Sequence, residues 1–116
     1  MEKNIELTLI YEIYKKLLTD NMRDVFELYY YSDLSLREIG EEKHISYQAV
    51  NDTLKKAEKA IYEYESKLNL SKMKQSITEL NNVLSKENVD LNELKKIASE
   101  LGELWCLIVY QIKCKM

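Results

Sequence analysis

The chain contains no proline and has glycine only at positions 40 and 102 of its 116 residues. Proline and glycine are the residues that most often interrupt helices, whereas the abundant Leu, Lys and Glu are well tolerated within them. A chain of this length forms one domain, or a small domain with an appendage. The sequence therefore predicts an all-α fold.

Residues 35–59, SLREIGEEKHISYQAVNDTLKKAEK, predict two helices joined by a tight turn. Ser35 and Glu38 have the spacing of a capping box, in which each side chain bonds a backbone N–H of the other residue. Gly40 lets two helices approach closely, and His44 stands where a left-handed residue would turn the chain. Ser46 caps the second helix. A helix-turn-helix unit of this kind can present its second helix to a groove of DNA.

Apolar residues recur at helical spacing along the rest of the chain. They predict helices at residues 6–18, 20–32, 71–85 and 91–113, and they extend the second helix of the motif to about residue 68. The first boundary falls at residues 69–71 and separates two predicted domains. They are a helix-turn-helix domain of about four helices at 1–70 and a C-terminal helical pair at 71–116 that braces it or dimerises. Residues 1–70 include 10 basic and 14 acidic side chains, and residues 71–116 include 7 basic and 6 acidic side chains. The half with the motif is therefore the more acidic.

The outer face of the second motif helix holds the candidate nucleic-acid contacts. They are Tyr47, Gln48, Asn51, Lys55, Lys56 and Lys59. Glutamine and asparagine can pair with adenine in the major groove, and lysines can neutralise phosphates. Asp52, Glu41 and Glu42 would repel phosphate, so a solvated helix face without a ligand is the alternative.

The last predicted helix is apolar around most of its circumference. Its candidate interface residues are Leu101, Leu104, Trp105 and Ile108. They form either core or a dimer seam, because one short neighbouring helix cannot cover so much apolar surface. Cys106 and Cys114 lack the spacing of a redox or metal motif, so core packing of two reduced thiols is expected.

The sequence shows no signature of an enzyme. It has no glycine-rich phosphate loop and no GxSxG, and His44, the one histidine, has no second histidine or nearby cysteine with which to bind a metal. We therefore expect no catalysis, no cofactor and no metal. The tyrosines at 29–31 are either core and rim residues or a stacking platform for single-stranded RNA.

The first residues, MEKNIELTLIYEIYKK, lack the order of a signal peptide. The longest apolar run, 104–110, is too short to span a bilayer. The net charge of −3 argues against a generally basic nucleic-acid binder but leaves a local basic patch open. We expect a cytoplasmic protein without membrane insertion.

Residues 17–42, LLTDNMRDVFELYYYSDLSLREIGEE, together with 45–59, resemble the YlxM family of small helix-turn-helix proteins. The local pattern is also similar to region 4 of sigma-70-type factors. The specific parts are ELYY before DLSL and the S-x-QAV-x-D start of the second motif helix. The resemblance covers about residues 1–70 and implies a cytoplasmic bacterial protein with a sigma-region-4-like helical bundle.

The resemblance also implies a regulatory role linked with the signal recognition particle pathway. The link comes from family genes that neighbour those of the particle's protein component or its receptor. The implied function is a regulatory protein that binds DNA or RNA, and a homodimer would place two reading helices on one site. The alternative is an adaptor that binds the particle's protein component or its receptor and no DNA.

Two positions depart from the family pattern. Tyr47 stands where the family usually has an arginine, which can hold a phosphate or a guanine edge. Tyrosine can stack or donate one hydrogen bond but brings no charge. Lys43 occupies a position that is usually apolar, which leaves two alternatives. Either its stem packs and its ammonium group reaches solvent, or the turn is looser than in the family.

Overall fold

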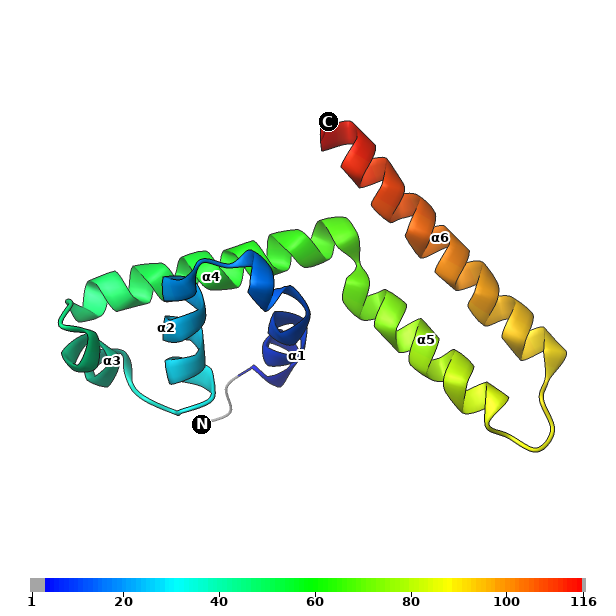
Figure 1. Ribbon diagram of the computed structural model, residues 1–116, viewed down its shortest axis with the longest axis horizontal. Helices are drawn as coiled ribbons and strands as arrows, with labels where there is room; N and C mark the ends of the chain where they lie inside the picture. The colour runs from blue at the N-terminus through cyan, green and yellow to red at the C-terminus, as the bar shows by residue number, and fades with distance from the viewer. Residues whose placement is uncertain (1–3, 116) are drawn as a thin grey trace. The chain divides into compact units, whose positions relative to one another are not determined.

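The computed structural model describes residues 4–115, with side chains through residue 112 (Figure 1). The described elements are α1 (Ile5–Tyr14), the 3-10 turn η1 (Lys15–Leu17), α2 (Asp20–Tyr30), α3 (Leu36–Lys43), α4 (Tyr47–Leu68), α5 (Leu70–Leu84) and α6 (Leu91–Lys115). The predicted all-α fold is confirmed, since no strand occurs in this part of the chain. None of these helices is long and apolar enough to cross a membrane.

Contacts divide the chain into two compact units. We call residues 1–64 the N-terminal unit and residues 65–116 the C-terminal unit. The division falls within the last turns of α4. Just after α4, Asn69 adopts a left-handed conformation, with φ of 53°, and separates α4 from α5. The domain border at residue 70 stays a prediction.

The first helix is shorter than its apolar pattern predicts. α1 ends at Tyr14, and one 3-10 turn follows before the extended backbone of Leu18. The guanidinium of Arg23 on α2 donates hydrogen bonds to the carbonyls of Lys15 (3.2 Å) and Leu18 (2.8 Å). These bonds join the backbone of the 3-10 turn and of Leu18 to α2, and they stabilise the early end of α1.

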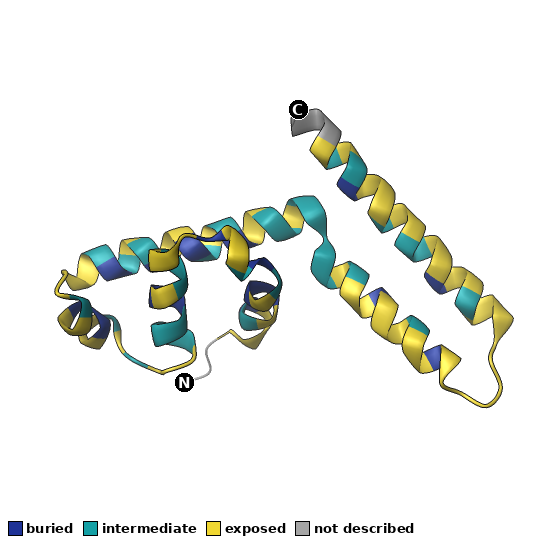
Figure 2. Ribbon diagram, in the orientation of Figure 1, coloured by how far each residue is buried: buried dark blue, intermediate teal, exposed yellow. Residues whose placement is uncertain are grey.

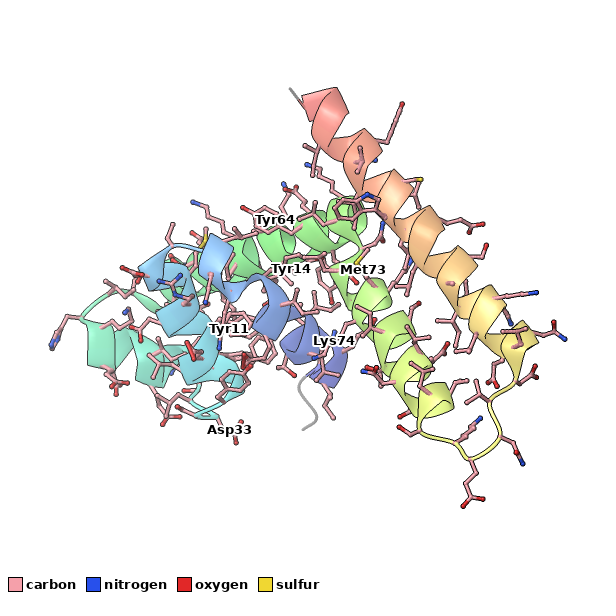
Figure 3. The ribbon with its side chains drawn as sticks, turned by 45° about the vertical axis from the view of Figure 1, so that its right-hand side comes forward. Tyr11, Tyr14, Asp33, Tyr64, Met73 and Lys74 are labelled. Atoms are coloured by element: carbon pink, nitrogen blue, oxygen red, sulfur yellow. The ribbon has the colours of Figure 1, made fainter. Side chains whose placement is uncertain are left out.

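Aromatic rings fill the core of the N-terminal unit. Tyr11 stacks on Phe26 with ring centroids 4.0 Å apart, and Tyr14 stacks on Tyr64 at 5.9 Å (Figure 3). Tyr30 also stacks on Phe26, at 4.4 Å. The other buried residues of this unit are Leu7, Ile10, Leu18, Val25, Ile39, Val50, Leu54, Ala57 and Ile61. Because α1 to α4 all contribute to one core, α3 and α4 are held in fixed positions.

The tyrosines at 29–31 take part in this packing. The ring of Tyr31 meets Tyr11 edge-on at 6.0 Å, and its hydroxyl donates to a carboxylate oxygen of Glu12 at 3.0 Å. Tyr29 packs edge-on against Tyr30 at 4.9 Å. The run therefore serves as core and rim of the unit, the first of the two alternatives drawn from the sequence.

The same packing shifts the ionisation of three tyrosines. The pKa of Tyr31 is raised to about 12, chiefly by burial and secondly by the neighbouring Glu12 carboxylate. Burial, together with a nearby glutamate, also raises the pKa of Tyr11 and of Tyr30 above the usual value. The folded unit therefore favours the neutral phenols over the phenolates.

In the C-terminal unit, α5 and α6 pack against each other as a helical hairpin (Figure 1). The residues of α6 on the packed side are spaced alternately by three and four, as in paired helices. They are Leu94, Ile97, Leu101, Leu104 and Ile108. Ile97 and Ile108 are buried and the other three are half-buried.

The packed face of α5 differs from the face that its apolar pattern predicts. The pattern predicts Met73, Ile77, Leu80 and Leu84. The buried residues are instead Ser76 and Val83, while Ile77 is 45% and Leu84 is 54% exposed. The contact with α6 is thus centred about one residue earlier, and it leaves part of the apolar surface of α5 open to solvent (Figure 2).

Candidate nucleic-acid interface

The helix-turn-helix unit consists of α3, a turn at residues 44–46 and the start of α4. The N–H of Glu38 donates to the hydroxyl oxygen of Ser35 at 3.1 Å, and the N–H of Ser35 donates to a carboxylate oxygen of Glu38 at 3.2 Å. This is the predicted capping box. It fixes where α3 begins and therefore where the turn falls.

The turn has the geometry expected from the sequence. His44 is left-handed, with φ of 58°, and its N–H donates to the carbonyl of Gly40, as does the N–H of Ile45 at 3.0 Å. The hydroxyl of Ser46 accepts from the N–H of Ala49 at 3.1 Å and caps α4. A Cβ at position 40 would lie 2.8 Å from the carbonyl oxygen of Ile45, so glycine is required for this close approach.

Lys43 joins α3 to α2. Its side chain is 21% exposed, and its ammonium group forms an ion pair with the carboxylate of Asp24. The expectation that this ammonium group reaches solvent is therefore only partly met. The ion pair holds the end of α3 where an apolar residue would hold it by packing.

Along α4, an exposed row runs outward from the turn. At about 100° per residue, positions 48, 52, 55 and 59 fall on one side of a helix. Gln48, Asp52, Lys55 and Lys59 occupy them, and all four are exposed. We call these four residues the α4 row. The buried residues Val50, Leu54, Ala57 and Ile61 define the opposite side.

The other predicted contacts flank the α4 row. Tyr47 is 49% exposed and Asn51 is half-buried, and both lie toward the packed side of α4. Lys56 is exposed on the other flank. The structure therefore brings Gln48, Lys55 and Lys59 together and sets the remaining three predicted residues to either side.

Arg37 is a positive charge that the sequence analysis missed. It is exposed on α3 and lines a surface hollow together with Gly40, His44 and Tyr47. It thus lies beside Tyr47, at which the family resemblance leads us to expect an arginine. The available signal was its position one turn before Gly40, on the side of α3 that must adjoin the start of α4.

Negative charge is mixed into the same surface. Asp52 lies within the α4 row, and Glu41 lines the hollow that contains Arg37. Glu42 is exposed on α3. The surface therefore offers only a few cations to a phosphate, and these carboxylates would repel it.

The predicted interface residues of the C-terminal unit are separated by the packing. Ile108 is buried within the hairpin, whereas Trp105 is 60% exposed.

Cys106 is a free, exposed thiol, so the expectation of core packing is wrong for it. The side chain of Cys114 lies outside the described residues. Among the residues that are described, no group of three His, Cys, Asp or Glu could hold a metal ion.

Comparison with known proteins places this geometry in a family context. Residues 1–101 match the family UPF0122, described as "Putative helix-turn-helix protein, YlxM / p13 like". A UPF0122 protein of Mycoplasma capricolum is 38% identical over 101 residues, which are 87% of this chain and 89% of that protein. A UPF0122 protein of Clostridium kluyveri is 46% identical over 79 residues, which are 68% of this chain and 71% of that protein. One from Bacillus mycoides is 36% identical over 108 residues, which cover 90% of this chain and 98% of that protein. The similarity continues past α4 through α5 and into α6.

Proposed function

This chain belongs to the UPF0122 family of YlxM/p13-like helix-turn-helix proteins, and from that premise we propose that it is a cytoplasmic regulatory protein of the signal recognition particle pathway that binds DNA or RNA through α4. The observation that carries the nucleic-acid proposal is the α4 row, in which Gln48, Lys55 and Lys59 share one exposed side of a helix fixed by the core. The pathway assignment rests on the resemblance of residues 17–59 to YlxM proteins.

Each group of the surface has a distinct role in this proposal. Gln48 lies in the first turn of α4, the part of a reading helix that reaches base edges, and its amide can pair with adenine. Lys55 and Lys59 lie farther along the helix and contact phosphates. Arg37 supplies the charge that Tyr47 lacks, while the ring of Tyr47 stacks or its hydroxyl donates one hydrogen bond. A homodimer would place two such helices on one site.

The test is fluorescence anisotropy with labelled duplex DNA and with labelled RNA at low salt. The variant Lys55→Glu plus Lys59→Glu should weaken binding strongly and lower the slope of log K against log salt by about 2, because two phosphate contacts are lost. Arg37→Ala should weaken binding further, and Arg37→Lys should retain part of it. Gln48→Ala should alter sequence preference more than affinity.

A matched control changes the charge equally at another place. Lys72 and Lys74 are exposed on α5, outside the helix-turn-helix unit. Lys72→Glu plus Lys74→Glu should leave binding nearly unchanged. If both double variants weaken binding to the same extent, or if neither does, the assignment of Lys55 and Lys59 as phosphate contacts is wrong.

The second proposed function is an adaptor that binds a protein component of the signal recognition particle or its receptor. The observation that favours it is the acidic character of the surface, with Asp52 within the α4 row and Glu41 and Glu42 exposed on α3. Such a surface complements a basic ribonucleoprotein partner. Calorimetry against the purified particle protein tests it. Heat of binding that disappears in Glu41→Lys plus Asp52→Lys supports the adaptor, and the absence of heat with the native chain rejects it.

A further inference from the structure

The α5–α6 hairpin has two broad faces of different character. Val83 and Ile97 line one shared hollow, and Ser76 and Leu104 line the next, so the two helices run past each other with these residues at matching levels. The face that contains these hollows is rich in charge. Its charged residues are Lys72, Glu79, Lys86, Glu93, Lys96, Glu100 and Glu103. This face is suited to solvent.

A second row of α6 is apolar and exposed. Leu91, Ala98, Trp105 and Ile112 recur every seven residues, and all four are exposed, with Leu91 at 62%, Trp105 at 60% and Ile112 at 49%. Gly102 lies between them with open space around it, because a Cβ added there would meet nothing within 4 Å. At about 100° per residue this row lies roughly a quarter-turn round the helix from the residues packed on α5.

α5 extends this apolar row into a face. Ile77 and Leu84 follow the packed residues Ser76 and Val83 by one position, and they are 45% and 54% exposed. Two antiparallel helices pack along one stripe of residues each. Residues that lie the same rotation around each helix from its own packed stripe, counted toward the C-terminus, fall on the same side of the pair. They therefore lie on the same side as the α6 row. We call this surface the apolar face, formed by Ile77, Leu84, Leu91, Ala98, Gly102, Trp105, Val109 and Ile112.

We propose that the apolar face is the interface between two copies of this chain. The two hairpins pair face to face into a four-helix bundle, with α6 antiparallel to α6 of the partner copy. Hairpins with one apolar and one charged broad face satisfy both faces in this way, since the bundle encloses the apolar faces and leaves the charged faces in water.

The area of the apolar face suits a dimer. The open part of Trp105 alone amounts to on the order of 150 Å² of apolar surface, and the four large aliphatic side chains around it are between 45% and 62% exposed. Two such faces together would bury about 1,000 Å² or slightly more, which is the size at which specific interfaces begin. Each face exposes about 500 Å² of apolar surface, which is the size of patch that often serves as an interaction site.

The sequence of the α6 row is complementary to itself when reversed. Turning α6 about a two-fold axis beside Gly102 brings Trp105 opposite the partner's Ala98 and brings Leu91 opposite the partner's Ile112. A large ring then faces a small residue, and the open space at Gly102 receives the approaching helix. A parallel pairing would instead oppose Trp105 to Trp105 and leave a gap at Gly102.

Charge favours the same orientation. Lys95 is exposed on α6 at the border of the apolar face, beside Ala98 and Gly102. A parallel pairing would place it beside Lys95 of the partner copy, and the two like charges would repel. In the antiparallel pairing the two lysines lie about 20 Å apart along the bundle at 1.5 Å per residue.

Trp105 is the only tryptophan of the chain, so its fluorescence reports on this face directly. The full chain should be a dimer by light scattering, and dilution to monomer should shift the Trp105 emission to the red as the ring becomes hydrated. Trp105→Glu should be monomeric at every concentration and should keep the helical circular dichroism of the native chain. Tyr110→Glu is the matched control, because Tyr110 is a 63% exposed aromatic residue of α6 about 140° round the helix from Trp105. It should stay dimeric.

Cross-linking tests the orientation in chains whose native cysteines are replaced by serine. Leu91→Cys mixed with Ile112→Cys should form a disulfide-linked heterodimer on mild oxidation, whereas Leu91→Cys alone should not. Efficient cross-linking of Leu91→Cys with itself would overturn the antiparallel arrangement. A native chain that is monomeric at all concentrations, or a Trp105→Glu chain that remains dimeric, would overturn the interface. None of these measurements contains nucleic acid, so failure here is distinct from failure of the proposed function.

Discussion

The eight largest fully buried side chains among the described residues all lie in the N-terminal unit. In the C-terminal unit, the buried apolar residues are Val83, Ile97 and Ile108, while Trp105 and four large aliphatic side chains of the apolar face remain about half exposed. Four helices can surround a core, but two helices cover only one stripe of each other. The contrast shows that the four helices of the N-terminal unit cover one another's apolar residues, whereas the two helices of the hairpin leave part of their apolar surface exposed. The second copy of the chain that we propose would cover this surface.

The largest effect should come from the aromatic core. Phe26→Ala removes the ring that stacks on Tyr11, and it should lower the free energy of unfolding of the N-terminal unit by about 3–5 kcal/mol. Eight of the nine tyrosines lie in that unit, and the one tryptophan lies in the other. Urea unfolding followed by near-ultraviolet circular dichroism of tyrosine should therefore shift, while the Trp105 signal should not. A common shift of both signals would show that the units unfold together.

Alkaline pH should also act on the N-terminal unit selectively. The pKa of Tyr31 is raised from 10.0 to about 12 in the fold, first by burial and then by Glu12. Because the folded state holds the proton more tightly, this contribution to stability is complete below pH 10 and is lost as the pH rises through about 12. Absorbance of tyrosinate at 295 nm should rise together with loss of helix, and Tyr31→Phe should reduce the pH dependence. Loss of the Trp105 signal first would contradict the prediction.

The two glycines should respond in opposite ways to the same substitution. Gly40→Ala places a Cβ 2.8 Å from the carbonyl oxygen of Ile45, and it should cost about 1–3 kcal/mol by overpacking the turn. Gly102→Ala meets no atom within 4 Å, and it should stabilise α6 by up to about 1 kcal/mol through helix propensity. Thermal unfolding in the Trp105→Glu background measures both without a contribution from association. An equal loss at both positions would mean that the surroundings of Gly102 are not open.

The smallest effect should be the loss of a helix cap. Ser35→Ala removes one half of the capping box of α3 and should cost about 1 kcal/mol. Asp90→Ala is the counterpart in the C-terminal unit, where the carboxylate of Asp90 accepts from the N–H of Asn92 at 2.9 Å. Its cost should be similar or smaller, because no reciprocal bond accompanies it. Hydrogen exchange in the first turns of α3 and α6 measures each cap, and unchanged protection after Ser35→Ala would contradict the prediction.

The α4 row could be predicted from the sequence only in part. Helical spacing was enough to expect Gln48, Lys55 and Lys59 on one outer side, since the buried stripe of α4 is regular. Arg37 was missed, because its proximity to Tyr47 depends on the angle between α3 and α4, which the turn sets. The ion pair of Lys43 with Asp24 was missed for the same reason, since the two residues lie on different helices and are 19 positions apart in the sequence.

By itself, the sequence determined the helices, their caps and the turn, because these depend on interactions between residues within about four positions of one another. The left-handed His44, the capping box at Ser35 and the requirement for Gly40 are all local in this sense. Only the tertiary structure decided which apolar stripes are covered. The choice of Ser76 and Val83 rather than Ile77 and Leu84 on α5 depends on where α6 lies, because the apolar spacing within α5 does not specify which edge of its apolar stripe is packed.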